Sequence, residues 1–470
     1  MRPLTRLPVT SALAGAVLAI AASVPSQAGA QGATVTQPVR AVSRRAARAF
    51  ASCPGARAAR SDSAVLAADL VSAHTGWVLT RTALLRTTDG GATWRCVTPP
   101  AAARALLGGG PLLAVRHAER AWLAYTGSGR AVTVSSTANG GRTWRNAIVP
   151  PPEGTSALSF ADTAHKYPLA LAIGPRGNAY LLTTPGAAAF QEPVALYRLA
   201  SGSAVWRQVA VSNPRSASPP TLSDKTGLRV TARAGAWMTG YGAGVGTYVY
   251  RSSDGGRTWR HVQLPLPPGY DVSGGAVDPM APAFFGVEGV LPVVLEGRRL
   301  RVVVERTTDG GRSWRLGVIV AEAQLVPPAV SFLSPRVGYL VGRRGLLVTH
   351  DGGVHWRAVG GRLPPGVTAL WFVSRQCGWA VAGAKLWATH DGGRAWQPLA
   401  LIAAPWHPRP PRPTATASPS RKASRAAPSG TEACRASLLP SRSPEFGLDP
   451  RPPRPQRRDR PLRPGPGRAT

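Results

Sequence analysis

The side chains of this sequence with the clearest capacity for chemistry are aspartates that recur in one short pattern. Residues 251–260 read RSSDGGRTWR, in which Asp254 precedes two glycines and Trp259 follows. A carboxylate in such a turn can act as a general base, coordinate a cation, or accept hydrogen bonds from the backbone. The number of copies discriminates between these uses, because a catalytic group is needed once.

The pattern occurs six times, and a degraded seventh copy, YRLASGSAVWRQV at 197–209, aligns without a gap on YRSSDGGRTWRHV. The tryptophans of successive copies are 40 to 62 residues apart, which is the period of a four-stranded propeller blade with variable loops. The residues at the acidic and tryptophan positions of the copies are Asp89, Trp94, Asn139, Trp144, Trp206, Asp254, Trp259, Asp309, Trp314, Asp351, Trp356, Asp391 and Trp396.

The segments around each copy identify the elements that position it. Residues 329–359 read AVSFLSPRVGYLVGRRGLLVTHDGGVHWRAV, which contains four short apolar or alternating runs separated by turn residues. Helical spacing is not sustained anywhere in the repeats. The sequence therefore predicts an all-β fold, a seven-bladed β-propeller of four-stranded antiparallel sheets over residues 63–401.

The pattern Ser/Thr-x-Asp-x-Gly-x-Thr/Ser-Trp resembles the Asp-box, also called the bacterial neuraminidase repeat. A strand with Gly-Trp or Gly-Tyr before T-x-DGG-x-x-W looks most like propellers related to the photosystem II assembly and stability factor, and sialidases and the sortilin ectodomain share the box. This resemblance covers roughly residues 63–401. It implies that the boxes lie at the edge remote from the ligand face, but it implies no activity, because function resides in sites and not in folds.

We interpret the box as a structural turn between the third and fourth strands. Asp254 can accept backbone N–H bonds, the glycines permit positive φ, and hydroxyls from Ser252 or Thr258 can add bonds. Trp259 can bury its ring between neighbouring sheets. A calcium loop needs more oxygen ligands than one acid per copy, so we expect no metal.

An enzyme of sialidase type is the main alternative. That resemblance would imply three arginines around a substrate carboxylate, a Tyr–Glu nucleophile pair and an acid/base aspartate, but residues 31–86 lack the Phe/Tyr-Arg-Ile-Pro motif of the first arginine. No carboxyl pair stands out, although Asp271 with Glu288 stays open. We expect a non-enzymatic binding or assembly scaffold without catalytic residues or cofactor. A diverged sialidase-like exo-glycosidase and a carbohydrate-binding propeller remain alternatives.

Basic residues gather in the loops predicted between second and third strands, at the edge opposite the boxes. A ring of cations there would attract an anionic ligand, and guanidinium suits carboxylate or phosphate. The competing interpretation is that solvated turns of an arginine-rich chain carry arginine in any case. The ligand-binding candidates are Arg130, Arg298, Arg299, Arg343, Arg344 and Lys385.

Two further features have a structural and a functional interpretation. His350 and His355 lie beside Asp351, and His390 lies beside the box aspartate of another blade, which favours turn capping over metal binding. The loop 264–275 contains Tyr270 and Asp271, which would contact a ligand if the loop covered the channel mouth; an ordinary linker is the commoner explanation.

The net charge of +34 reflects 56 basic against 22 acidic residues. Lysine contributes only four of the basic residues, and abundant Ala, Gly, Pro and Arg with scarce Lys is typical of a high-GC bacterium. Since no nucleic-acid-reading motif accompanies the charge, we expect no nucleic-acid partner. The expected partner is a protein or an anionic glycan of the cell envelope, bound by a monomer.

The two ends of the chain differ in composition from the repeats. Residues 1–30 have the charged start, short apolar run and small-residue site of a signal peptide, so we expect a secreted protein without a transmembrane span. Residues 31–62 form an N-terminal leader. Residues 402–470 are a Pro/Arg-rich tail, predicted to be disordered, whose extreme end also fits a frameshifted reading frame.

Four cysteines are too few and too scattered for a metal site. In an oxidising compartment one bridge is expected, and Cys53–Cys96 is our first choice because these two are nearest in sequence. The remaining cysteines are Cys377 and Cys434.

The structural interpretation of the box makes a direct prediction. Trp259→Ala should lower the free energy of unfolding by about 3–5 kcal/mol, because it deletes a large buried ring. A melting temperature equal to that of the wild type would show that Trp259 is not buried.

Overall fold

The computed structural model describes the repeat region as an all-β assembly with a single 3-10 helix at Ala105–Leu107. No helix in the described segments is long and apolar enough to cross a membrane. The described residues are 64–107, 110–127, 131–153, 167–186, 192–212, 219, 224–231, 235–241, 248–270, 277–295, 300–320 and 329–404.

The first three sheets each contain four strands that follow one another in sequence and pair antiparallel. The first sheet comprises β1 (Val65–Leu70), β2 (Gly76–Thr80), β3 (Leu84–Thr87) and β4 (Trp94–Cys96). The second comprises β5 (Leu112–His117), β6 (Arg120–Thr126), β7 (Val132–Thr137) and β8 (Arg145–Ile148). The third comprises β9 (Tyr167–Ile173), β10 (Ala179–Thr184), β11 (Ala195–Leu199) and β12 (Trp206–Val211).

The remaining four sheets repeat this order. The fourth comprises β13 (Asp224–Val230), β14 (Ala236–Tyr241), β15 (Tyr248–Ser252) and β16 (Arg260–His261). The fifth comprises β17 (Val277–Pro279), β18 (Ala283–Phe285), β19 (Glu288–Leu295), β20 (Arg301–Thr307) and β21 (Ile319–Val320), with β17 and β18 sharing the inner edge of β19. The sixth comprises β22 (Val330–Phe332), β23 (Gly338–Gly342), β24 (Gly345–Thr349) and β25 (Arg357–Ala358). The seventh comprises β26 (Val367–Phe372), β27 (Gly378–Ala382), β28 (Lys385–Thr389) and β29 (Gln397–Pro398).

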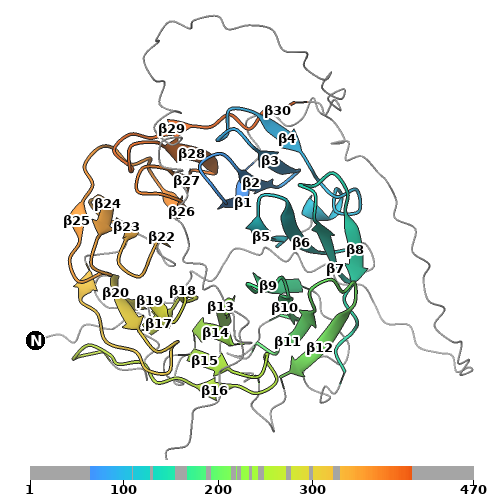
Figure 1. Ribbon diagram of the computed structural model, residues 1–470, viewed down its shortest axis with the longest axis horizontal. Coiled ribbons are helices and arrows are strands. Elements are labelled where there is room, and N and C mark those ends of the chain that lie inside the picture. The colour runs from blue at the N-terminus through green and yellow to red at the C-terminus, as the bar shows by residue number, and fades with distance from the viewer. Residues whose placement is uncertain are drawn as a thin grey trace, which may run out of the picture.

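The seven sheets of the described chain are the blades of a β-propeller, which confirms the predicted fold class (Figure 1). The first strand of each blade lies nearest the central axis and the fourth lies at the periphery. The core consists of apolar clusters between neighbouring blades. For example, Trp77 and Leu79 of the first blade pack with Leu123 and Tyr125 of the second.

The ring closes on the outer side of the first blade. Strand β30 (Ala403–Ala404) pairs in parallel with β4, so that Ala403 lies opposite Trp94 (Figure 1). At the inner side, the N–H of Val65 donates to the carbonyl of Ala384 in the seventh blade. The predicted boundary at residue 401 did not anticipate β30, because two alanines carry no strand pattern.

Each blade joins the preceding one at the turn between its third and fourth strands, which we call the DGG turn. In the fifth blade, the Trp314 ring packs edge-on against Trp237 of the fourth blade, with centroids 5.8 Å apart. Trp144 packs similarly on Trp77 of the preceding blade. Gly311 has φ +76°, and a Cβ atom there would overlap the Trp237 ring. The second glycine is thus required by both its backbone angle and this close approach.

Arginines in third strands bridge blades in the other direction. The guanidinium of Arg86 stacks over Trp77, the residue opposite it on β2, at 5.5 Å from the ring centroid. The same group reaches the second blade, where it donates to the carbonyl of Ala118 and pairs with Glu119 at 2.7 Å. Each blade therefore contacts both neighbours through side chains of its third strand and DGG turn.

The two glycines of one turn make a matched pair for testing this joint. Gly310→Ala should lower the free energy of unfolding by about 1–2 kcal/mol, because its φ is +73°. The space around Gly310 is open, so the added methyl group meets no neighbour. Gly311→Ala should lower the free energy of unfolding by a further ~1–3 kcal/mol, because the added methyl group also collides with Trp237. Urea unfolding of both variants measures the difference, and equal losses would contradict the close approach.

Candidate functional site

The aspartates of the DGG turns are engaged by their own turns. The carboxylate of Asp254 accepts hydrogen bonds from the N–H groups of Arg257 and Thr258, and from the hydroxyls of Ser252 and Thr258 at 2.8 and 2.6 Å. Burial raises the pKa of Asp254, but these hydrogen bonds outweigh it and lower the pKa to about 2. The indole N–H of Trp259, itself buried, donates to the carbonyl of Gly256 and closes the turn.

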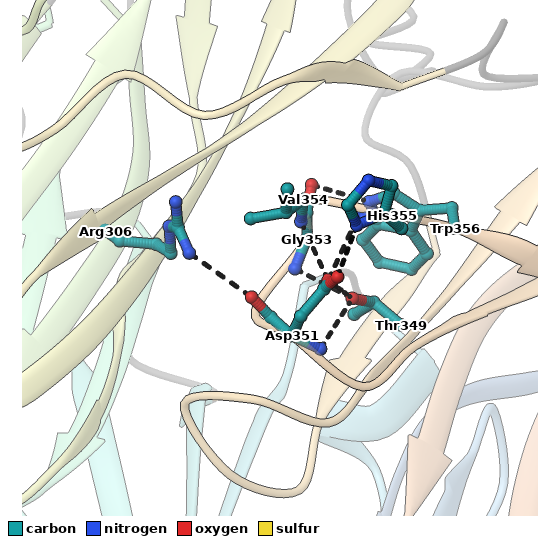
Figure 2. A network of polar contacts seen from close by, with 7 residues as sticks. All are labelled: Arg306, Thr349, Asp351, Gly353, Val354, His355 and Trp356. Atoms are coloured by element: carbon teal, nitrogen blue, oxygen red, sulfur yellow. Dashed lines mark hydrogen bonds and ion pairs between the residues drawn. The ribbon is translucent and has the colours of Figure 1, made fainter.

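The sixth blade shows the same arrangement with a histidine (Figure 2). Asp351 accepts from the N–H groups of Val354 and His355 and contacts the His355 ring nitrogen Nδ1 at 2.7 Å. Burial raises the pKa of Asp351, yet the hydrogen bonds from His355 and Thr349 hold it well below its usual range. The guanidinium of Arg306 in the fifth blade donates to the Asp351 carbonyl, so the turn is fixed from the preceding blade as well.

Copies that lack the carboxylate keep the turn. Asn139 accepts the Thr143 N–H at 2.9 Å and donates its amide to the Thr143 hydroxyl. In the degraded copy, β11 and β12 still flank the turn and Trp206 is buried. His350 and His390 lie in the sixth and seventh blades, and no group of three metal-ligating side chains occurs among the residues that the structure places.

The opposite edge carries a group of cations that we call the basic edge. In the antiparallel order of each blade, the turns between second and third strands and the links to the next blade both lie there. The seventh, sixth and first blades are neighbours, and all the basic side chains of their described loops at this edge are exposed. The basic edge consists of Arg81, Arg104, Arg343, Arg344, Arg362 and Lys385.

Acidic side chains of the same three blades lie elsewhere. Residues 64–107 and 329–404 contain four acids: Asp89, Asp351 and Asp391 in DGG turns, and Asp69 near the end of β1. All four are at the DGG-turn end, so no described acid of these blades compensates the basic edge. Like charges gathered on one rim produce a positive field that falls off over about a Debye length, ~8–10 Å at physiological salt.

The structure assembles only part of the predicted ligand set. It brings Arg343, Arg344 and Lys385 to adjacent blades on one edge. Arg130, Arg298 and Arg299 lie outside the described residues, as does Asp271. Sequence reasoning missed Arg104 and Arg362, because it considered only loops between second and third strands.

The possible ligand contact at Tyr270 is not supported. Its side chain packs against the apolar cluster between the fourth and fifth blades, beside Leu264 and Trp314. This packing fits the linker interpretation of this part of the loop, and the ligand contact of Tyr270 stays a prediction.

At the axis, one equivalent residue per blade forms what we call the axial layer. These residues are defined by register, each lying opposite the second or third residue of its neighbouring strand, such as Trp77 in β2 or Trp122 in β6. The members are Asp69, Ala114, Ala172, Arg229, Ala283, Ser331 and Trp371.

Side chains of the axial layer bind the exposed inner edge of the next blade. The Val115 N–H donates to the Asp69 carboxylate, and the Phe372 N–H donates to Ser331 Oγ at 3.0 Å. These contacts occupy equivalent places in the first and sixth blades. Burial raises the pKa of Asp69 to about 6, against the opposing effects of the Val115 N–H and the Arg229 charge.

The fifth blade contains a buried acid that the turns do not use. Glu305 is fully buried, and neither of its carboxyl oxygens has a hydrogen-bond partner in the described structure. It shares a sheet face with Val303 and lies opposite Leu291, both in the cluster between the fourth and fifth blades. Burial raises the pKa of Glu305 to about 8.

Cys96 and Cys377 are both disulfide-bonded. Cys53 and Cys434 lie outside the described residues, so the pairing Cys53–Cys96 stays a prediction. The same holds for the signal peptide at 1–30, the leader at 31–62 and nearly all of the 402–470 tail.

No protein-family model matches the chain, and no curated protein gives a significant match. Among solved structures, YCF48 from Cyanidioschyzon merolae is 15% identical with a TM-score of 0.49, covering 70% of this chain and 96% of that one. YCF48 bound to a D1 peptide is 16% identical with a TM-score of 0.41, covering 70% and 91%.

The GH74 enzyme of Niastella koreensis is 13% identical with a TM-score of 0.49, covering 71% of this chain and 53% of that one. Likeness at this level supplies no activity, ligand or partner for this chain. The propeller assignment depends on the strand pairing itself.

Glu305 predicts a pH dependence of stability. The folded-state pKa near 8 exceeds the ordinary value of 4.5, so folding retains a proton. The contribution of Glu305 to stability is therefore greatest below pH 4.5 and is lost as pH rises through 8. Glu305→Gln, which cannot ionise, should gain up to about 4–5 kcal/mol over the wild type across that range.

Chemical unfolding between pH 4.5 and 9 measures this gain. Glu288→Gln is the control, because Glu288 is exposed at the start of the neighbouring strand β19. A stability difference between Glu305→Gln and wild type that does not change with pH would contradict the buried, unpaired state of Glu305.

Proposed function

We propose that this chain is an exported, non-enzymatic Asp-box propeller that acts as a binding or assembly scaffold and engages an anionic partner through the basic edge. The observation that carries the proposal is that no described acid of three adjacent blades lies at the basic edge. In three adjacent blades, every described acid lies at the DGG-turn end and six exposed cations lie at the other.

The two edges differ in how their charged groups are engaged, and this difference supports a binding scaffold. The repeated carboxylates accept hydrogen bonds within their own turns, as Asp254 does, and this keeps them from attracting a ligand. Cations on the basic edge come from different blades, which the inter-blade contacts hold at fixed separation. A rigid set of exposed guanidinium groups suits carboxylates or phosphates on a polymer or protein surface.

Charge removal at each edge tests the proposal. Changing Arg343, Arg344 and Lys385 together to serine should weaken binding of poly-L-glutamate and of polygalacturonate by about tenfold or more, and should reduce its salt dependence. Polygalacturonate separates a glycan from a polypeptide source of carboxylates. Fluorescence anisotropy at several salt concentrations provides the measurement.

The matched control removes the same charge from the DGG-turn edge by changing Arg142, Arg312 and Arg336 to serine, and it should bind like the wild type. Equal losses in both variants would show that only net charge matters and would overturn the basic edge. Release of fluorophore from a fluorogenic sialoside would overturn the non-enzymatic part and favour the sialidase-like alternative.

A further inference from the structure

The axial layer contains two opposite charges that belong to non-adjacent blades. Asp69 is in the first blade and Arg229 is in the fourth, yet each acts electrostatically on the other. Blades in these positions approach each other only at the axis of the ring, so both charged groups must reach toward it. Their strands, β1 and β13, lie on opposite sides of the axis (Figure 1), and no ion pair between the two side chains is recorded among the described residues.

Water reaches both groups. Arg229 is exposed and Asp69 is partly exposed, although each belongs to an innermost strand. With its pKa near 6, Asp69 is mainly ionised at neutral pH. Burial lowers the pKa of Arg229, and the charge of Asp69 opposes that effect. Opposite charges that are accessible but not paired with each other can each accept a counter-charge from a ligand.

The rest of the layer gives the site its shape. Three of the other five members are alanines, at positions 114, 172 and 283, so their side chains add little bulk beside the charges. Trp371 packs against the apolar cluster between the seventh blade and the neighbouring first blade, and part of its side chain is exposed. A carboxylate and an indole face on one side attract an ammonium group, and a guanidinium on the other attracts a carboxylate.

We propose that the axial layer binds a small zwitterion, with its ammonium or methylated ammonium group at Asp69 and Trp371 and its carboxylate at Arg229. This site goes beyond the proposed function, because it lies at the DGG-turn end and uses none of the cations of the basic edge. The alanines of the layer offer no competing charge, which favours a ligand that neutralises both charges at once.

Isothermal titration calorimetry with glycine betaine tests the proposal on the full chain. Betaine should bind the wild type, and 3,3-dimethylbutanoate, which has a carbon in place of the charged nitrogen, should bind at least about tenfold more weakly. Asp69→Asn and Arg229→Gln should each weaken betaine binding by about tenfold or more. Asp69→Asn keeps an acceptor for the Val115 N–H, so the fold is retained.

Two matched controls complete the test. Arg301→Gln removes an exposed cation from β20 and should leave betaine binding unchanged. Trp371→Phe should retain most of the binding that Trp371→Leu loses, because only the former keeps an aromatic face. Thermal unfolding of every variant checks that the ring is intact.

No betaine binding to the wild type, equal binding of betaine and dimethylbutanoate, or unchanged binding in both charge variants would overturn the proposal. The triple serine variant of the basic edge should bind betaine like the wild type. Failure of the basic edge and failure of the axial site are thus distinguishable.

Discussion

The contact between each DGG turn and the preceding blade is the interaction on which the rest of this ring depends. A glycine in the left-handed region approaches the neighbouring sheet, and the following tryptophan packs on it, as Gly311 and Trp314 do on Trp237. Because the joint is repeated, each blade is positioned by its neighbour, and small side chains at the axis stay at fixed separations. This contact therefore fixes the distances between side chains of different blades, both at the basic edge and in the axial layer.

The repeat explains why so much of the fold was predictable. Seven copies at blade spacing determine the number of sheets, the position of each turn and the edge at which the turns lie. Side-chain sets formed across the ring were not predictable in the same way. Asp69 and Arg229 are far apart in sequence, and only the strand register shows that they occupy equivalent places.

Some signals were present but needed that register to be recognised. Glu305 occupies the place that Leu85 has in the first blade and Leu347 in the sixth, so an alignment of third strands would mark it as an acid at an apolar position. Arg104 and Arg362 lie in links between blades, where no repeat pattern points to them. Because arginine is abundant throughout the chain, the sequence does not show which cations lie together in the fold.

The closure by β30 has a consequence for how the chain reaches its folded state. The outer edge of β4 is completed by Ala403 and Ala404, the last strand residues that the structure places, and the inner edge of the same blade depends on Ala384. The first blade to be synthesised is therefore the last to be finished. Its unpaired strand edge stays open until some three hundred further residues have followed. Folds dominated by non-local pairing fold slowly and expose strand edges while they do so.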